Sequence, residues 1–96
     1  MSDITITRLT VRPIEGKTRL VGAADISIND AFRITGIRIL KRQDGELFVD
    51  YPSRQTADGR YVSIAYPVTS EVRTGIEQLI LEKYRESVEG QEKAEG

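Results

Sequence analysis

The spacing of apolar residues changes at Pro67, and this change constrains the fold more than any other feature of the sequence. Before Pro67, apolar and polar side chains alternate in short runs, a period of two that is typical of half-buried β-strands. After Pro67, apolar residues recur at steps of three and four, which indicates an amphipathic helix with the apolar positions Val72, Ile76, Leu79, Ile80, Tyr84 and Val88. Strands followed by one helix predict an α+β domain.

The first three predicted strands form an antiparallel meander. Residues 4–13 alternate with a change of face after Ile6, which suggests a bulge. Glu15-Gly16-Lys17 and Asn29-Asp30 are predicted turns between strands. A further change of face at Gly36 indicates a second bulge or a close crossing of backbones. One face of this meander is expected to pack on the core.

Two more strands are predicted at residues 47–51 and 61–66, after a turn at Gln43-Asp44-Gly45. Each ends before a proline, which has no amide hydrogen to donate to a sheet. The segment between them, residues 53–60, is longer than a tight hairpin needs and contains the turn pair Asp58-Gly59. We therefore expect an antiparallel sheet of about five strands, with a polar loop that is suited to binding.

The predicted helix begins at Thr69 or Ser70, either of which can cap its first amide groups. Gly75 lies in the early turns and suggests that the helix approaches a strand closely. The polar residues 89–96 are predicted to form a disordered acidic tail, which leaves residues 1–88 as a single domain. An open sheet face or edge in such a domain favours a homodimer.

Composition excludes several classes of chemistry. The 96 residues include no Cys and no His, so Cys/His zinc sites, Ser-His-Asp triads and imidazole bases are all excluded. No phosphate-binding glycine loop or dinucleotide motif is present, and we expect neither an enzyme nor a cofactor. The sequence has no run of eighteen apolar residues and no recognisable signal peptide, so a cytoplasmic location is expected.

Charge is distributed unevenly although the net charge is only −1. Residues 1–60 hold ten Lys or Arg against eight Asp or Glu, a net charge of +2, whereas residues 61–96 hold four against seven, a net charge of −3. Any surface that binds anions is therefore expected in the first two thirds of the chain.

Two groups of basic residues are candidates for phosphate contacts. Arg38, Lys41 and Arg42 cluster at the end of the third strand, where a solvated strand end is the alternative interpretation. Arg54 and Arg60 flank the polar loop, and their guanidinium groups could pair with phosphate oxygens. In the same loop, Gln55 and Thr56 could contact bases or phosphates.

Tyr51, Tyr61 and Tyr66 surround the loop and could stack on unpaired bases, or they could simply pack with their hydroxyl groups in water. Asp25 and Asp50 could be imagined as an acid–base pair. Their spacing does not support this, and a solvated strand face explains them.

Several motifs occur in the order that is typical of one known family. They are Asp30-Ala31-Phe32-x-Ile34, Gly36-Ile37-Arg38-Ile39, Gly45-x-Leu47-Phe48-Val49-x-x-Pro52-Ser53, Thr56-x-Asp58-Gly59 and Ser70-x-x-Arg73-x-x-Ile76. Together they resemble the SpoVG family (stage V sporulation protein G, or septation proteins) over roughly residues 3–86. Two residues depart from the family pattern: Gln55 stands where a second basic residue is common, and Tyr66 stands where His is common.

The resemblance implies a small cytoplasmic homodimer that binds DNA or RNA and regulates gene expression, septation and sporulation. It assigns the nucleic-acid contact to Arg54 in the basic loop, with Tyr61 and Arg73 in the following strand and helix start. The alternative is a non-catalytic protein-interaction module of the division septum that binds no nucleic acid.

Overall fold

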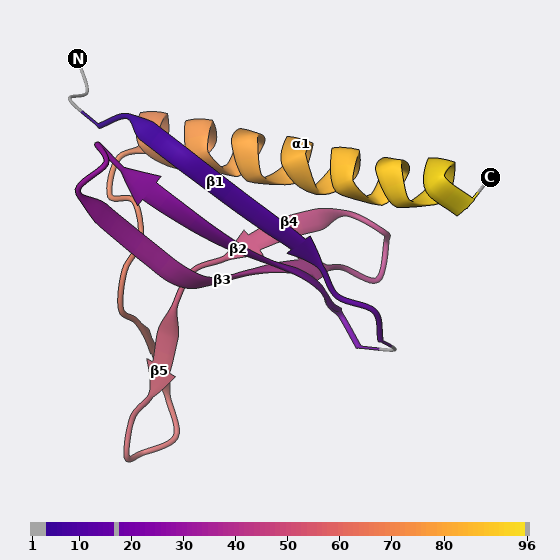
Figure 1. Ribbon diagram of the computed structural model, residues 1–96. Helices are drawn as coiled ribbons and strands as arrows, with labels where there is room; N and C mark the ends of the chain where they lie inside the picture. Colours follow the sequence, from indigo (N-terminus) through magenta and orange to yellow (C-terminus); the bar gives the residue numbers. More distant parts are fainter. Residues whose placement is uncertain (1–3, 17, 96) are drawn as a thin grey trace.

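The computed structural model describes residues 4–16 and 18–95 and arranges them as a main sheet, a projecting hairpin and one long helix (Figure 1). Four antiparallel strands form the main sheet in the order β1-β2-β3-β4, with the bounds Ile6–Pro13, Leu20–Ile28, Phe32–Lys41 and Leu47–Asp50. Two short strands, β5 (Ser53–Gln55) and β6 (Tyr61–Ser63), pair with each other in a separate sheet. The helix α1 spans Ser70–Glu95 and lies across one face of the main sheet. The predicted α+β class is confirmed.

Both predicted bulges are present. The register between β1 and β2 shifts between Ile6 and Arg8, and the register between β2 and β3 shifts next to Gly36, which has a φ of 80°. Asn29 and Asp30 have φ angles of 52° and 54°, as the two central residues of a type I′ turn require, and the amide of Ala31 donates to the Ile28 carbonyl at 2.9 Å. The predicted turn at residues 15–17 includes Lys17, which lies outside the described residues.

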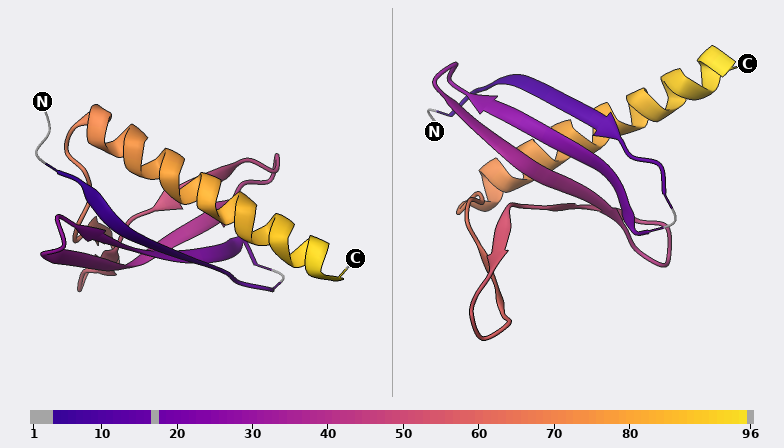
Figure 2. Two further views of the ribbon diagram at one scale, coloured as in Figure 1. Left: turned by 45° about the horizontal axis from the view of Figure 1, so that its top comes forward. Right: turned by 60° about the horizontal axis from the view of Figure 1, so that its bottom comes forward.

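The main sheet has four strands rather than about five, because the last predicted strand pairs elsewhere. Pro52 ends β4, and the chain then forms a hairpin from the segment that the sequence indicated as a loop. Gly59, with a φ of 89°, closes the turn and brings residues 53–55 against residues 61–63. Strand β6 ends at Ser63, so Pro67 does not terminate it. Figure 2 shows this hairpin projecting away from the sheet and the helix.

The core lies between α1 and the main sheet. Ile76 and Ile80 of the helix are buried with Ile26, Ile37 and Ile39 of the strands. The prediction that Leu79 lies on the apolar face of the helix is wrong, since Leu79 is 45% exposed. The buried face follows Ile76 and Ile80, which are four residues apart, and Leu79 lies beside it.

Tyr84 extends the contact between helix and sheet along β2. A Cβ atom placed on Gly22 would lie 3.1 Å from Cδ1 of Tyr84 and 3.2 Å from Cδ1 of Ile39. The close approach therefore occurs at Gly22. The approach expected at Gly75 is not found, since a Cβ atom there would meet nothing within 4 Å.

Thr69 caps the helix, since its Oγ1 accepts a hydrogen bond of 3.3 Å from the amide of Val72. The backbone remains helical past Val88 to Glu95, where the sequence indicated a disordered tail. Residues 91–95 include Gln, Lys, Ala and Glu, which all favour helix, and no proline interrupts them. Gly96 lies outside the described residues. Within residues 4–16 and 18–95, no helix is both long and apolar enough to cross a bilayer.

The two glycines give opposite predictions for stability. Gly75→Ala should raise the free energy of unfolding by about 0.5–1 kcal/mol, because glycine costs backbone entropy in a helix and the new methyl group meets open space. Gly22→Val should lower it by roughly 1–3 kcal/mol, because the larger side chain overpacks against Tyr84. Urea denaturation followed by circular dichroism measures both. Equal changes in the free energy of unfolding for the two substitutions would contradict the close contact at Gly22 and the open space at Gly75.

Candidate nucleic-acid interface

The tip of the projecting hairpin is held by a local hydrogen-bond network. Thr56 and Arg60 pair through their backbones, with 2.7 Å between the Thr56 nitrogen and the Arg60 oxygen. The Thr56 hydroxyl donates to the Asp58 carboxylate, and the Gln55 amide donates to the Gly59 carbonyl at 3.2 Å. Gln55 and Thr56 were predicted to contact nucleic acid. In the structure both hydrogen-bond within the turn.

Arg60 forms an ion pair with Asp58, with 2.9 Å between Nε and Oδ2. Both side chains are exposed, so the pair leaves the guanidinium accessible to water. The hydrogen bond from the Thr56 hydroxyl lowers the pKa of the Asp58 carboxyl, and contacts from Arg60 act in the same direction. The tip therefore carries two arginines and one carboxylate, which is a weaker positive surface than the sequence suggested.

The two faces of the hairpin separate Arg54 from Tyr61. Arg54 is the cross-strand partner of Val62, and Gln55 is the partner of Tyr61. Because cross-strand partners share a face and successive residues alternate, Arg54 and Tyr61 lie on opposite faces. The expected joint action of a basic and an aromatic side chain on one ligand is not favoured at this position.

The side chains of the basic cluster at the end of β3 are only partly available to bind a phosphate. Arg38 forms an ion pair across the strands with Asp50, and its Nε lies 3.0 Å from Oδ2 of Asp50. Arg42 lies over the ring of Phe48 at 5.0 Å from the centroid, a contact that leaves its charge exposed. Lys41 is exposed at the end of β3.

Arg73 belongs to the joint between helix and sheet. Its guanidinium lies 5.3 Å from the ring centroid of Tyr51 and 3.8 Å from the Glu77 carboxylate. The Tyr51 hydroxyl donates to the same carboxylate at 3.0 Å. Burial is the main cause that raises the pKa of Tyr51, and Glu77 raises it further. Tyr51 is therefore a packing residue, whereas Tyr61 and Tyr66 are exposed and remain candidates for stacking.

An arginine-bearing surface that sequence reasoning missed lies on the face of the main sheet opposite α1. The residues of β1 to β3 that point away from the core include Arg8, Arg12 and Arg33, which the sequence did not indicate as a site, and Arg38, which it did. We call this surface the arginine face. Asp25 and Asp50 lie on the same face of the strands, and Asp30 lines the depression beside Arg8 and Arg33, so the excess of arginine is one charge. The sequence carries a signal for it in Arg8-x-Thr10-x-Arg12, where both arginines alternate with apolar positions.

The register of the sheet brings two of these arginines together. Arg8 on β1 and Arg33 on β3 are both cross-strand partners of Ser27 on β2. Arg33 Nε donates to Ser27 Oγ at 3.3 Å, and both arginines line a shallow polar depression at this end of the sheet. No ion pair is found for either arginine among the described residues. Two guanidinium groups beside a hydroxyl form a suitable contact for phosphate oxygens.

The outer surface of α1 carries charges of both signs. The outer surface of α1 presents Glu71, Glu82 and Glu86 to water, with Lys83 and Arg85 between them. The exposed arginines of the sheet therefore lie on the other side of the domain from Glu82 and Glu86. Among the described residues, no three acidic side chains lie close enough to hold a metal ion.

Comparisons with known proteins agree with the resemblance seen in the sequence. The SpoVG family model matches residues 4–86. A protein of Phytoplasma australiense named "Putative septation protein SpoVG" is 41% identical over 81 residues, which cover 84% of this chain and 83% of the relative. Proteins of the same name from Agathobacter rectalis and Acetivibrio thermocellus are 36% and 31% identical, over 88% and 95% of this chain and 95% and 96% of their own lengths.

The Tyr51–Glu77 contact predicts a change in alkaline stability. The raised pKa means that folded Tyr51 holds its proton more tightly than the unfolded chain does, so its contribution is complete below about pH 10 and is lost as the pH rises further. Tyr51→Phe should lower the free energy of unfolding by about 1 kcal/mol at pH 7 and make the decline above pH 10 less steep. Denaturation at a series of pH values measures this. Tyr61→Phe, at an exposed ring, is the matched control and should change neither quantity.

Proposed function

The chain belongs to the SpoVG family, and from this premise we propose that it is a septation protein that binds DNA or RNA as a homodimer and so regulates gene expression and cell division. The relatives carry the name of septation proteins, and no enzymatic activity appears in that name. We infer a non-catalytic role in the cytoplasm. Whether sporulation is involved depends on the host.

The observation that carries this proposal is the arginine face. A single helix covers only one face of the main sheet, and the other face presents guanidinium groups from β1 and β3. Nucleic-acid backbones are bound through such groups, because each contact with a phosphate releases condensed counterions. Arg8 and Arg33 are two strands apart, so their backbones are separated by about 10 Å, a distance that two phosphates of one nucleic acid can span.

Several residues that were predicted from the sequence to bind nucleic acid lie outside the arginine face and could extend the contact. Arg42 continues the positive surface at the end of β3, whereas Lys41 alternates onto the helix side together with Ile39. Arg60, at the tip of the hairpin, is a secondary contact that Asp58 weakens. Tyr61 offers an exposed ring on which a base could stack. Arg38 and Arg73 are already engaged with carboxylates, so we assign them smaller contributions.

A protein-interaction module of the septum is the second candidate. The net charge of −1 and the exposed apolar side chains near the hairpin favour it. Partners that remain bound after nuclease treatment, together with no salt-dependent binding to nucleic acid, would support this function in place of the first.

Removal of two arginines tests the first proposal. Arg8→Ala/Arg33→Ala should weaken binding to labelled duplex DNA, single-stranded DNA or RNA, and should reduce the slope of log K against log salt by about two, one for each lost phosphate contact. Fluorescence anisotropy over a salt series measures both quantities.

The matched control is Arg85→Ala/Lys83→Ala, which removes the same charge from the acidic helix surface and should leave the slope unchanged. If the two double variants lose affinity equally, or if neither loses any, the arginine face does not bind nucleic acid. Circular dichroism confirms that both variants are folded.

A further inference from the structure

Strand β1 is the longer open edge of the main sheet. It pairs with β2 along one side, and among residues 4–16 and 18–95 no strand pairs with its other side. Strand β4, at the opposite edge, has four residues, whereas β1 has eight. The unpaired amide and carbonyl groups of an edge strand can form hydrogen bonds with a further strand. β1 is therefore the edge that offers more backbone groups to an added strand.

The register identifies the backbone groups that face the open side. The amide of Ile14 donates to the Val21 carbonyl at 2.9 Å, so these two residues form a hydrogen-bonded pair of the antiparallel ladder. Hydrogen-bonded and non-hydrogen-bonded pairs alternate along such a ladder, and the register from Arg8 to Pro13 is regular. Leu9 and Val11 therefore lie in non-hydrogen-bonded pairs, and their N–H and C=O groups point away from β2.

The regular part of the edge has a defined length. The register is irregular between Ile6 and Arg8, and Pro13 has no amide hydrogen to donate. Bulges and prolines of this kind limit unwanted pairing at the ends of an edge strand. The residues between them, 8–12, keep the regular geometry that an added strand requires, so the edge fits a short extended segment.

An apolar groove lies beside this edge, between the start of β1 and α1. It has a volume of about 340 Å³, and Ile4, Ile6, Val72 and Leu79 are among the residues that line it. A Cβ atom on Gly75 would meet nothing within 4 Å, so this part of the groove is open. Figure 2 shows α1 crossing the sheet at an angle and extending past β1. Side chains of an added strand that point toward the helix would therefore pack on the exposed Leu79.

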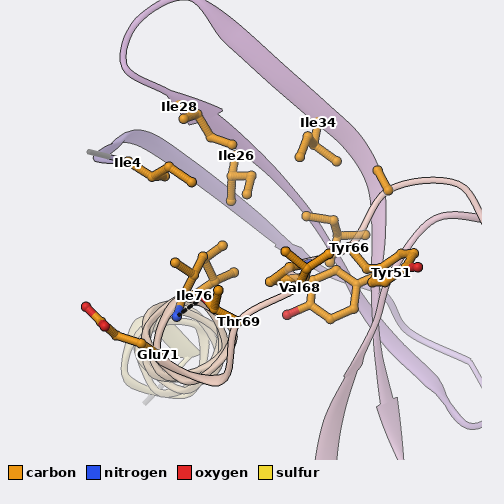
Figure 3. A pocket seen from close by; sticks show the side chains of 14 residues that line it. Ile4, Ile26, Ile28, Ile34, Tyr51, Tyr66, Val68, Thr69, Glu71 and Ile76 are labelled. Carbon is orange, nitrogen blue, oxygen red and sulfur yellow. Dashed lines mark hydrogen bonds between the residues drawn. The ribbon is translucent and has the colours of Figure 1, made fainter. Parts of the chain in front are cut away.

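The apolar surface of the groove continues into the interior. Ile4, Val72 and Ile76 also line a larger apolar cavity, of about 440 Å³, beside the first turn of α1 (Figure 3). Leu9 of β1 packs against the core but is only partly buried, whereas Ile26 on the neighbouring strand is 2% exposed. The β1 side of the core therefore lacks apolar cover that an added strand would supply.

The side of β1 that faces away from the helix is basic. Arg8 and Arg12 are exposed there, and neither forms an ion pair among the described residues. Thr10 lies between them and is the cross-strand partner of Asp25, whose carboxylate is on the side of β1 that is already paired. On the open side, acidic residues at alternate positions of an added strand would lie beside the two guanidinium groups.

We propose that the open edge of β1 binds an extended segment of a partner protein in which acidic and apolar residues alternate. The backbone of the segment pairs with Leu9 and Val11, its acidic side chains lie beside Arg8 and Arg12, and its apolar side chains pack on Leu79. This site goes beyond the nucleic-acid contact of the proposed function, because a nucleic acid has no amide and carbonyl groups with which to continue a sheet.

A second copy of this chain fits the edge less well than an acidic partner does. If two β1 strands paired antiparallel with Leu9 opposite Val11, Arg8 of one copy would lie opposite Arg12 of the other. Like charges directly opposite each other on neighbouring strands are destabilising. An acidic segment replaces this repulsion with attraction.

Backbone methylation of a peptide tests the ladder. The probe is a fluorescently labelled synthetic peptide in which glutamate and valine alternate, and anisotropy measures its binding to the full chain without nucleic acid. Only every second amide of an added strand faces the edge. N-methylation of that alternate set should weaken binding by about tenfold or more, because the hydrogen bonds to β1 are lost, whereas methylation of the other set should leave binding unchanged. Equal effects of the two sets would overturn the proposal.

A substitution in the groove tests the apolar contact. Leu79→Glu should weaken binding of the unmethylated peptide by about tenfold or more, because a carboxylate would then face the valine side chains. The matched control is Ile64→Glu, at another exposed apolar residue outside the groove, which should leave binding unchanged. Circular dichroism confirms that both variants are folded. Equal affinities of these two variants would contradict the groove as the binding surface.

A charge reversal tests the choice of an acidic partner. Arg12→Glu should weaken binding of the glutamate peptide by about tenfold and should strengthen binding of a peptide with lysine in place of glutamate. Arg85→Glu, at an exposed position on α1, is the matched control and should change neither affinity. If the lysine peptide binds the wild-type chain as tightly as the glutamate peptide does, the partner is not acidic and the proposal fails.

These measurements separate the peptide site from the proposed function. Leu79→Glu should keep the wild-type salt slope for nucleic acid, whereas Arg8→Ala/Arg33→Ala should reduce that slope. Failure of the peptide to bind would therefore remove this site alone. Sedimentation of the same variant examines the other occupant: self-association that Leu79→Glu abolishes, in a chain that does not bind the peptide, would assign the groove to a second copy and overturn the proposal.

Discussion

The packing of one helix against one face of a four-stranded sheet determines the rest of this structure. Ile76 and Ile80 bury the inner faces of β2 and β3, and Tyr84 closes over Gly22. A single helix cannot cover both faces of a sheet or reach both ends of one face. Two surfaces therefore stay open, and they differ in chemistry: the outer face of the sheet carries arginine, and the corner beside the start of the helix is apolar.

Separation of charge explains how a chain with a net charge of −1 can present a positive surface. Glu82 and Glu86 of α1 are exposed to water, whereas Glu77 contacts Tyr51 of the sheet side, and the arginines of β1 and β3 point away from the helix. Attraction to a polyanion depends on the local field rather than on the total charge, so the net value conceals the binding surface. The same separation keeps the acidic helix away from any phosphate bound on the arginine face.

The hairpin that follows β4 is the part of the fold that differs most from the prediction. Pro52 ends that strand, and the local turn at Gly59 pairs residues 61–63, which the sequence indicated as a strand, with residues 53–55, which it indicated as a loop. Local pairing satisfies the backbone groups of residues 53–55 without any apolar alternation, which is why periodicity did not indicate β5. The hairpin lies outside the main sheet and carries apolar side chains such as Val62 into water.

The sequence alone determined the α+β class, the bulges, the turn at Asn29-Asp30, the helix cap and the family, because each depends on local backbone preferences or on ordered motifs. Only the tertiary structure showed that Arg8 and Arg33 both flank Ser27, because their proximity depends on the register between strands that lie 25 residues apart in sequence. It also separated Arg54 from Tyr61, which are close in sequence but lie on opposite faces of one hairpin. Spacing along a chain fixes the period of an element, whereas the face that an element presents to its neighbours is fixed by packing across the whole domain.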